Sequence, residues 1–510
     1  MRITAIEMNA LRRAQNIFLP AFKGEPLEKA AFFQFLPSPM RAVTKKFLKE
    51  EFTGEDGETK LLWTPRGKNT RIAFFGLGER KAWNTRKALL IPRRMVQFAK
   101  REKIKEFALP LSDVFGTEEN HAARVATNAI LADYDFNRYK ETPKDGWPKV
   151  KNITLAVEKK LIRDVEQKIT EGIIIGEETN RARDLANTPG GDMTPKLLAA
   201  EAKRAGKEWN IPVTIFDEKK MKALGMGGIL GVAQGSTEPP RFIIMEYKGG
   251  HKDQKPLVLV GKGVTFDTGG LNIKPDQYIY EMHMDMSGGA AVIHGVAAIA
   301  RLKLPINAVG IVPAVENMPS GSSYRPGDLL KTMSGKTIEV LNTDAEGRVI
   351  LSDALWYGWK YFKPGLMVDF ATLTGAAHVA VGNFMSAVFT KKKETEDLLR
   401  DVGSKSGDYV WPFPLWDEYL ADIKGTFGDL SNIAKSDRYG GAIHGAKFLE
   451  QFTGEADWAH IDIAPKMTTI DSEFLSKGAS GVGVRFIVEL AKRYAEKAPN
   501  HKSQIPNKSQ

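Results

Sequence analysis

Seven charged side chains in three short segments are of the types that support metal-dependent hydrolysis. They are Lys262, Asp267 and Lys274 in VGKGVTFDTGGLNIKP, Asp285 in MHMDMSGG, and Asp344, Glu346 and Arg348 in NTDAEGRVIL. Four carboxylates gathered at one site would repel one another, and some would stay protonated, unless cations neutralised them. Bridging oxygen ligands suit pairs of divalent ions such as Mg, Mn or Zn, which activate water for attack on a carbonyl. Together these residues favour a two-metal hydrolase.

The third segment has a regular spacing. Asp344, Glu346 and Arg348 lie two residues apart, so in an extended chain all three point to one side. Helical sequence follows at once, so we expect a strand-to-helix junction here. Taken alone, the segment is better explained as a polar turn with an Asp cap and a local salt bridge. The other carboxylates shift the balance toward a metal site.

Other hydrolase signatures are missing from the sequence. There is no HExxH, no GxSxG and no Walker loop, and the glycine-rich stretch 225–231 lacks dinucleotide-binding spacing. The absence of cysteine excludes disulfides, thiolate zinc sites, iron–sulfur clusters and cysteine nucleophiles.

The segments that carry these residues lie among alternating predicted strands and helices. Short apolar runs predict buried strands at 257–260, 308–315 and 366–370, and helical stretches occupy 289–302 and 349–362. This alternation predicts an α/β fold with a mainly parallel sheet flanked by helices. Ligands in such sheets bind at the carboxyl ends of the strands.

The N-terminal part reads as a smaller α/β unit. A buried strand is expected at 71–78, followed by a basic helical stretch that Pro92 breaks or kinks. Apolar residues four apart then line one face of a long helix that ends near Pro189; they are Leu161, Val165, Ile169 and Ile173. We therefore expect an N-terminal α/β domain at 1–158, a connecting helix at 159–188, a catalytic domain at 189–496 and a disordered polar tail at 497–510.

The net charge of +11 comes entirely from the first hundred residues, since the other 410 sum to zero. The densest basic stretch runs from Lys81 to Lys105. It fits either a solvated helix face or a surface that meets nucleic acid, and no zinc-finger or RNA-binding signature accompanies it. No apolar run is long enough to span a membrane, and the N-terminus has no secretory signal core, so a cytoplasmic protein is expected.

The sequence closely resembles the cytosolic leucyl aminopeptidase family, the M17 dimetal aminopeptidases. NTDAEGR at 342–348 is that family's signature. Further matching motifs are DLANTP at 184–189, VGKGVTFDTGG at 260–270, DFATLTGA at 369–376 and WAHIDIA at 458–464. The resemblance covers the whole C-terminal domain. It implies a leucyl aminopeptidase that acts on peptides with a free N-terminus and assembles as a homohexamer.

The resemblance also implies roles for single residues. It implies ligands of a tightly held metal at Lys262, Asp267, Asp285 and Glu346. It implies ligands of a second, exchangeable metal at Asp267, Asp344 and Glu346. The ions would be Zn or Mn, with Mg or Co as alternatives, and a ligating lysine would have to be neutral. Lys274 would stabilise the oxyanion, and Arg348 would hold a bicarbonate ion as proton shuttle because its planar fork matches a planar anion.

Substrate specificity would come from five positions that line the family's first side-chain pocket. They are Met282, Thr372, Leu373, Ala464 and Met467. An apolar pocket there favours Leu, Met or Phe at the peptide N-terminus; the alternative is that these residues simply pack the core.

Three residues depart from the family pattern or invite misassignment. Pro465 stands where the family usually has Gly, and His444 stands where a small residue or Thr is usual. His283, two residues before Asp285, is expected to be structural rather than a ligand. The competing hypothesis for the whole chain is a protein that kept the peptidase fold and binds nucleic acid through its basic N-terminal domain.

Overall fold

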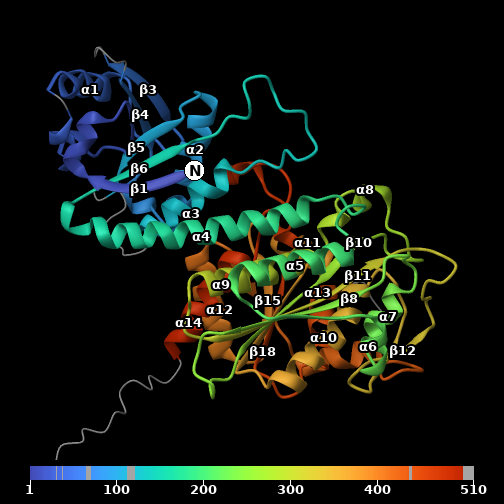
Figure 1. The fold of residues 1–510 in the computed structure, drawn as a ribbon. Coiled ribbons are helices and arrows are strands. Elements are labelled where there is room, and N and C mark those ends of the chain that lie inside the picture. Colours follow the sequence, from blue (N-terminus) through green and yellow to red (C-terminus); the bar gives the residue numbers. More distant parts are fainter. Residues whose placement is uncertain (30, 37, 65–69, 112–120, 436–438, 498–510) are drawn as a thin grey trace, which may run out of the picture. The chain divides into compact units, whose positions relative to one another are not determined.

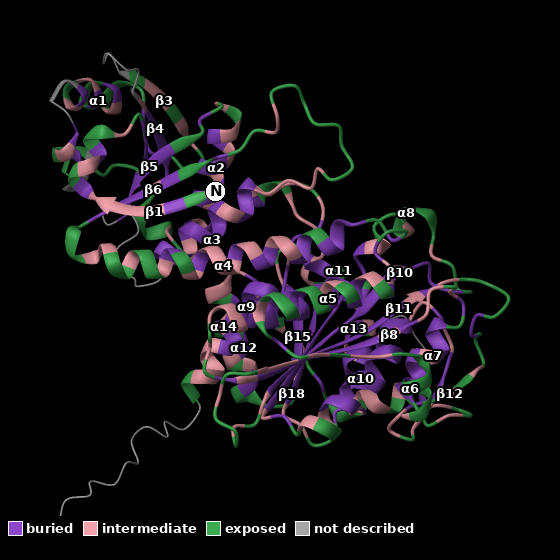
Figure 2. Cartoon of the chain, in the orientation of Figure 1, coloured by how far each residue is buried: buried purple, intermediate pink, exposed green. Residues whose placement is uncertain are grey.

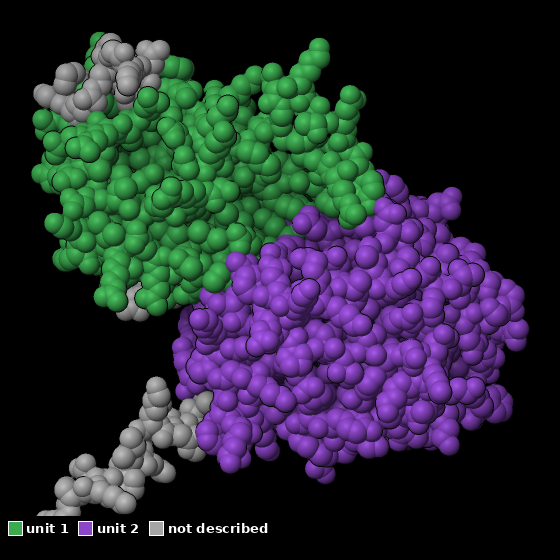
Figure 3. Space-filling view, viewed as in Figure 1, with its two compact units in different colours: residues 1–180, 469–477 green, residues 181–468, 478–510 purple. Residues whose placement is uncertain are grey.

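The computed structural model describes residues 1–29, 31–36, 38–64, 70–111, 121–435 and 439–497. The predicted disordered tail lies outside the described residues beyond Lys497. The chain forms two compact units, coloured separately in Figure 3. Unit 1 comprises Met1–Asn180 and Thr469–Lys477, and unit 2 comprises Arg181–Thr468 and the residues from Gly478 onward. The two-domain α/β architecture expected from the sequence is confirmed.

The core of unit 1 is a sheet with strand order β1-β6-β5-β2-β4-β3 (Figure 1). Its strands are β1 (Arg2–Glu7), β2 (Asn16–Ala21), β3 (Thr59–Thr64), β4 (Thr70–Gly76), β5 (Glu106–Pro110) and β6 (Asn152–Val157). β3 pairs antiparallel with β4, and the other pairings are parallel. β4 confirms the strand predicted at 71–78.

Alternating side chains divide the interior of unit 1 into two clusters. On β2, Phe18 packs into one cluster with α2 (Thr85–Arg101) and α3 (His121–Asp133). Ile17 and Leu19 point the opposite way, into a cluster with α1 (Ser38–Glu50). This period of two is what a strand buried on both faces requires.

Pro92 does not break the basic helix. α2 runs without interruption from Thr85 to Arg101 and contains Pro92 in its interior, so of the two predicted alternatives the break is wrong, and the kink stays a prediction. A proline removes one backbone hydrogen bond, a cost that burial can offset. Ile91 and Met95, on either side of it, lie in the hydrophobic cluster of unit 1 and hold the helix against the sheet.

The long helix expected before Pro189 is α4 (Ile162–Asn187). Ile169 is buried in unit 1, and Val165 and Ile173 pack against the same cluster, which confirms the predicted apolar face. The segment Thr469–Lys477, which the sequence placed in the catalytic domain, groups with unit 1.

Unit 2 is built on a sheet with strand order β16-β15-β18-β14-β9-β11-β8-β7, and β10 pairs with β11. The strands are β7 (Val213–Phe216), β8 (Arg241–Lys248), β9 (Leu257–Gly261), β10 (Gly263–Asp267), β11 (Asn307–Asn317), β14 (Leu366–Ala371), β15 (Ser386–Thr390), β16 (Val410–Pro412) and β18 (Trp458–Asp462). The central strands β11, β9, β14 and β18 pair with one another in parallel. On either side of them, β8 pairs antiparallel with β11, β7 with β8, and β15 with β18. The strands predicted at 257–260, 308–315 and 366–370 are β9, β11 and β14.

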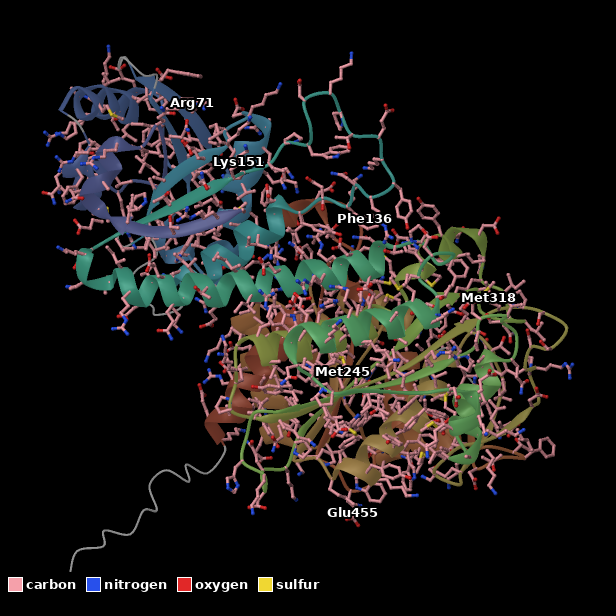
Figure 4. The ribbon with its side chains drawn as sticks, in the orientation of Figure 1. Arg71, Phe136, Lys151, Met245, Met318 and Glu455 are labelled. Carbon is pink, nitrogen blue, oxygen red and sulfur yellow. The ribbon has the colours of Figure 1, made fainter. Side chains whose placement is uncertain are left out.

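Helices cover both faces of this sheet (Figure 1). One face carries α5 (Pro195–Trp209), α9 (Ser287–Arg301), α12 (Lys393–Ser406) and α14 (Val484–Lys497). The other carries α6 (Glu218–Ala223), α7 (Gly227–Ala233), α10 (Glu346–Phe362) and α13 (Gly441–Glu450). The central strands β9, β14 and β18 are buried throughout (Figure 2), as strands of a sheet covered on both faces must be. Met245 on β8, labelled in Figure 4, is one such interior residue.

Shorter elements complete unit 2. They are α8 (Asp276–Ile279), α11 (Gly375–Val381), the 3-10 helices η6 (Met282–Met284) and η8 (Ala464–Lys466), and a small sheet of β12 (Leu329–Lys331), β13 (Thr337–Glu339) and β17 (Leu430–Ser431). Among the described residues, no helix has the length and apolar character needed to cross a bilayer.

Candidate active site

The charged residues singled out in the sequence lie at the carboxyl ends of the central strands of unit 2. Lys262 sits between β9 and β10, Asp267 ends β10, and Lys274 follows in the next loop. Asp285 closes η6 just before α9, and Asp344 precedes α10. A parallel sheet brings these strand ends to one edge, which is where such folds bind ligands.

Three of the four carboxylates converge closely. Asp267, Asp344 and Glu346 each offer a ligand atom, and these atoms lie within 4.8 Å of one another. Asp267 and Glu346 are buried and Asp344 is half-buried. Asp285 stands slightly apart from this trio and is joined to Glu346 through the amine of Lys262.

Lys262 is enclosed by acidic groups. Its Nζ lies 2.7 Å from Asp285 Oδ2 and 2.8 Å from Glu346 Oε1, and it donates a 2.9 Å hydrogen bond to the carbonyl of Thr372. Its approach requires Gly347, because a Cβ at that position would lie 2.8 Å from Nζ. Burial alone would lower the pKa of Lys262, but the surrounding carboxylates outweigh it and hold that pKa above its usual value.

Lys274 faces the same cluster from the other side. Its Nζ lies 2.9 Å from Asp267 Oδ2 and also pairs with Asp344. Burial acts to lower the pKa of Lys274, and the carboxylates, Asp267 first, raise it overall. The side chain keeps 15% of its exposure, so it borders open space as well as the carboxylates.

The two lysines do not satisfy the acidic cluster. Burial, followed by the charge of Asp267, raises the pKa of Glu346 to about 8, and burial raises that of Asp285 to about 6 although Lys262 opposes it. Glu346 Oε2 is buried and has no hydrogen-bond partner. Divalent cations would remove the repulsion between the carboxylates and give Glu346 Oε2 a partner, since hard carboxylate oxygens are their preferred ligands. The donor set therefore fits the metal ions that the sequence implied.

Arg348 is buried beside the cluster in the first turn of α10. Its Nη1 donates a 2.8 Å hydrogen bond to the carbonyl of Asn432, while its Nε has no hydrogen-bond partner. Burial lowers the pKa of Arg348 to about 10, and the charges of Glu346 and Asp462 only partly oppose this. A guanidinium held in this way is a ready site for a planar anion.

The extended-chain interpretation of the third segment is wrong. Glu346 and Arg348 belong to the first turn of α10, not to an extended strand. Their side chains converge on the site because the helix begins at Glu346, where a carboxylate also complements the helix dipole. Asp344 alone lies in the preceding turn.

The predicted specificity residues lie around this edge of the sheet. Thr372 and Leu373 follow β14, and Thr372 Oγ1 donates a 2.6 Å hydrogen bond to Asp285 Oδ1. Met282 is half-buried at the start of η6. Ala464 and Met467 follow β18, and Met467 also packs against the hydrophobic core, so part of the alternative packing role is present.

The residues that departed from the family pattern have partners of their own. His444 on α13 is buried, and its Nε2 lies 2.9 Å from Asp422 Oδ2. Pro465 is buried in η8, where a proline suits the start of a helical turn. Burial lowers the pKa of the half-buried His283, which is not part of the carboxylate cluster found among the described residues.

Sequence reasoning missed the residues that hold the carboxylates in place. Asn317 ends β11, and its Nδ2 donates 2.8 Å to Asp267 Oδ1 and 3.0 Å to the carbonyl of Thr343. Asn432 accepts the backbone N–H groups of Leu341 and Asn342 on its Oδ1. A polar residue ending an apolar strand run was the available signal for Asn317, whereas nothing local marks Asn432.

Comparison with known proteins assigns the chain to a family. The model of the cytosol aminopeptidase family's catalytic domain matches residues 180–488, and that of its N-terminal domain matches 18–143. A "Probable cytosol aminopeptidase" of Geobacter sulfurreducens is 39% identical over 469 residues, covering 92% of this chain and 94% of the relative. One from Chlorobaculum tepidum is 41% identical over 464 residues, covering 87% and 91%.

A solved structure has the same fold. The bottromycin maturation enzyme BotP in complex with Mn matches with a TM-score of 0.82 and 27% sequence identity, covering 94% of this chain and 100% of that one. Family models across both units, relatives near 40% identity over most of the chain, and the carboxylate–lysine site agree. The chain belongs to the cytosol aminopeptidase family.

Proposed function

We propose that the protein is a two-metal aminopeptidase that releases N-terminal residues from peptides, with a preference for Leu and other apolar side chains. One observation carries the proposal: four carboxylates and two lysines converge where strands end, with Glu346 Oε2 buried and unsatisfied. Membership of the cytosol aminopeptidase family supports aminopeptidase activity with divalent metals.

Five residues would hold the metals: Lys262, Asp267, Asp285, Asp344 and Glu346. Bound there, two divalent ions would supply an activated water and polarise the scissile carbonyl. Lys262 would have to lose its proton to act as a ligand, which the added positive charge would favour. Asp267 is prepared for such a role, because Gly269 and Asn317 fix its Oδ1 and its Oδ2 faces the site.

Lys274 would stabilise the negative charge that develops on the substrate carbonyl oxygen. Its amine already lies among the carboxylates, and its side chain keeps 15% of its exposure. Arg348 would hold a bicarbonate ion that carries a proton between water and the leaving amine. The free Nε and buried position of its guanidinium support that assignment.

The apolar preference rests on the residues around the site. Met282, Thr372, Leu373, Ala464 and Met467 would surround the first side chain of the peptide. Leu373 is partly buried against the core, so its position is fixed by packing rather than by solvent. A wall of this kind would favour Leu, Met or Phe over charged residues.

Zn or Mn are the metals we propose, with Mg or Co as alternatives. The similarity to a structure that contains Mn supports a divalent ion of this class. A location in the cytoplasm belongs to the same proposal and is supported by the names of the relatives.

We also propose that the chain assembles as a homohexamer. Large apolar side chains of unit 2 are exposed in the single chain, among them Tyr280, Trp416, Phe427 and Tyr439. Where such groups gather into a contiguous patch, they mark a contact surface. A native mass measurement tests the proposal: a hexameric mass would support it, and a monomeric mass would contradict it.

The proposed activity is tested with purified protein, leucine p-nitroanilide and added Mn or Zn. Hydrolysis of this substrate, and not of its N-acetyl derivative, is expected because binding requires the free α-amine. Alanine, methionine, phenylalanine and glutamate p-nitroanilides measure the preference. Inactivity with every divalent metal and every aminoacyl amide would contradict the proposal.

The nucleic-acid alternative gains no support from the structure. Several basic residues of the stretch that motivated it are turned inward on α2: Arg93 is 3% exposed, and Lys100 pairs with Asp135 at 2.7 Å. A surface that binds a phosphate backbone needs its cations in solvent.

A further inference from the structure

A cavity of about 320 Å³ lies within unit 1, beside the first half of α2. Arg86, Lys87, Leu90, Ile91 and Arg94 line it from one face of that helix. Their spacing places them on successive turns that face the same way. A volume of this size falls in the range of small-molecule sites.

The basic wall of the cavity carries more positive than negative charge. Lys87 Nζ lies 2.8 Å from Asp56 Oδ2, and Arg94 Nη1 lies 3.8 Å from Asp56 Oδ1. Among the described residues that line the cavity, Asp56 is the one carboxylate, and its side chain is 53% exposed. Arg86 is 4.0 Å from Glu473, which also pairs with Arg93 outside the cavity.

Arg94 is the innermost of these cations. Its side chain is 10% exposed, and its guanidinium donates long hydrogen bonds of 3.3–3.4 Å to neutral acceptors: the carbonyls of Gly76 and Glu58 and the hydroxyl of Thr59. Burial lowers the pKa of Arg94 below its usual value, and Asp56 offsets this only in part. A buried guanidinium with weak neutral partners gains most from an anion that it can grip with two parallel N–H groups.

The remaining lining is mostly apolar, with Asn84 as its polar residue. Its apolar residues are Trp83, Leu90, Ile91 and Phe474. The Trp83 ring packs edge-to-face on Phe22 with ring centroids 5.3 Å apart, which holds its orientation. Such a wall accommodates an uncharged ring or chain attached to the anion.

We propose that this cavity binds a small phosphate monoester with an aromatic or apolar organic part. The phosphate would lie between Arg94 and Lys87, displacing Asp56, and the organic part would lie against Trp83 and Leu90. A dianion matches this wall better than a single carboxylate would, since Arg94 and Lys87 share one exposed acid, Asp56. The cavity has room for a small molecule rather than for a polymer, which distinguishes this site from a nucleic-acid surface.

Isothermal titration calorimetry on the full-length protein tests the proposal with phenyl phosphate as probe. Phenyl phosphate is expected to bind about tenfold more tightly than inorganic phosphate or benzoate, because it offers both charge and ring. Arg94→Gln should weaken binding about tenfold, and Lys87→Gln somewhat less. Asp56→Asn should tighten binding, because the competing carboxylate is removed.

Matched variants decide where the probe binds. Arg101→Gln, at the exposed end of the same helix, should leave the affinity unchanged, since the Arg101 side chain is 68% exposed. Arg348→Gln should also leave it unchanged; loss of binding there would place the probe in the peptidase site and overturn the proposal. If Arg94→Gln fails to fold, as judged by its melting curve, Lys87→Gln and Asp56→Asn carry the test. No binding at millimolar phenyl phosphate, equal binding of benzoate, or affinities unmoved by these variants would each overturn it.

Discussion

Two regions of the molecule bury charge in opposite ways. At the carboxyl ends of the unit 2 strands, four acidic side chains share two lysines, and Glu346 Oε2 is left without a partner. On α2 of unit 1, Arg93 donates hydrogen bonds to the carbonyl of Glu473 and to Asn128 Oδ1, and it forms an ion pair with the Glu473 carboxylate. Lys100 forms an ion pair with Asp135. A cluster of like charges is stabilised by binding ions of opposite charge. A buried cation with its own acidic partner contributes to stability instead, because losing either partner is costly. The first region is therefore expected to govern activity and the second stability.

Removal of metal should have the largest effect. Dialysis against a strong chelator is expected to reduce hydrolysis of leucine p-nitroanilide to background, because the activated water is lost. The fold should survive, since Lys262 and Lys274 keep partial charge balance in the cluster. Activity assays with Mn or Zn added back, alongside circular dichroism, check both parts. A chelated protein that stays fully active, with no metal detected by mass spectrometry, would contradict the comparison.

Arg93→Ala should destabilise the protein while sparing the chemistry. The substitution leaves Glu473, which is 8% exposed in its side chain, without its nearest buried cation. Breaking a buried ion pair from one side costs about 3–5 kcal/mol. Arg86 remains 4.0 Å from Glu473, so we expect a loss of unfolding free energy near the lower end of that range.

Urea unfolding followed by fluorescence measures this loss. Arg101→Ala is the control, because it lies on the same helix with an exposed side chain and should change the unfolding free energy by less than about 0.5 kcal/mol. Equal stability of the two variants would show that the inward-facing arginine does not hold unit 1 together.

Lys274→Ala should lower turnover by roughly 10²–10³-fold, the usual cost of losing one group that stabilises an oxyanion. Metal content should persist, because the carboxylates remain and lose a competing cation. Kinetics and metal analysis on the same sample separate these effects. The matched control is Lys248→Ala at the exposed end of β8, which should leave turnover unchanged. Unchanged turnover in Lys274→Ala would remove this lysine from the reaction.

The sequence predicted the architecture of unit 2 and its acidic residues for the same reason. Apolar runs identify strands buried on both faces, and polar residues directly after them fall at the edge where the strands end. Lys262, directly after the strand predicted at 257–260, is the clearest example, whereas the strand that Asp267 ends was not among those predicted. The place of these residues directly after apolar runs thus indicated the edge of the sheet at which they lie.

Contacts between distant segments could not be predicted in this way. The sequence placed Arg93 in a basic surface stretch. In the structure Arg93 is buried against Glu473, which lies nearly four hundred positions further along the chain. Glu346 and Arg348 were read as an extended pair, and the start of α10 places them in a helical turn instead. Such details depend on which segments pack together, and neither local composition nor periodicity reports that.

Substitution of Asn317 is expected to have the smallest effect on activity, and it tests how the acidic cluster of unit 2 is held in place. The Asn317 amide joins Asp267 Oδ1 to the carbonyl of Thr343, so it fixes a carboxylate that we propose as a metal ligand relative to the loop that carries Asp344. Its side chain would not contact a metal ion in the proposed arrangement, and its effect must therefore act through Asp267. Asn317→Ala is expected to weaken metal affinity or activity by about 10–100-fold, as loss of an outer hydrogen-bonding partner does.

Asn307, at the opposite end of the same strand, provides the control. Its side chain contacts the 250–254 loop instead of the carboxylates, so Asn307→Ala should leave metal affinity unchanged. A titration of metal into each chelated variant measures the affinity directly. Excess metal should restore much of the activity of Asn317→Ala if the residue only positions Asp267. A loss that excess metal leaves untouched would instead assign Asn317 a direct part in substrate binding.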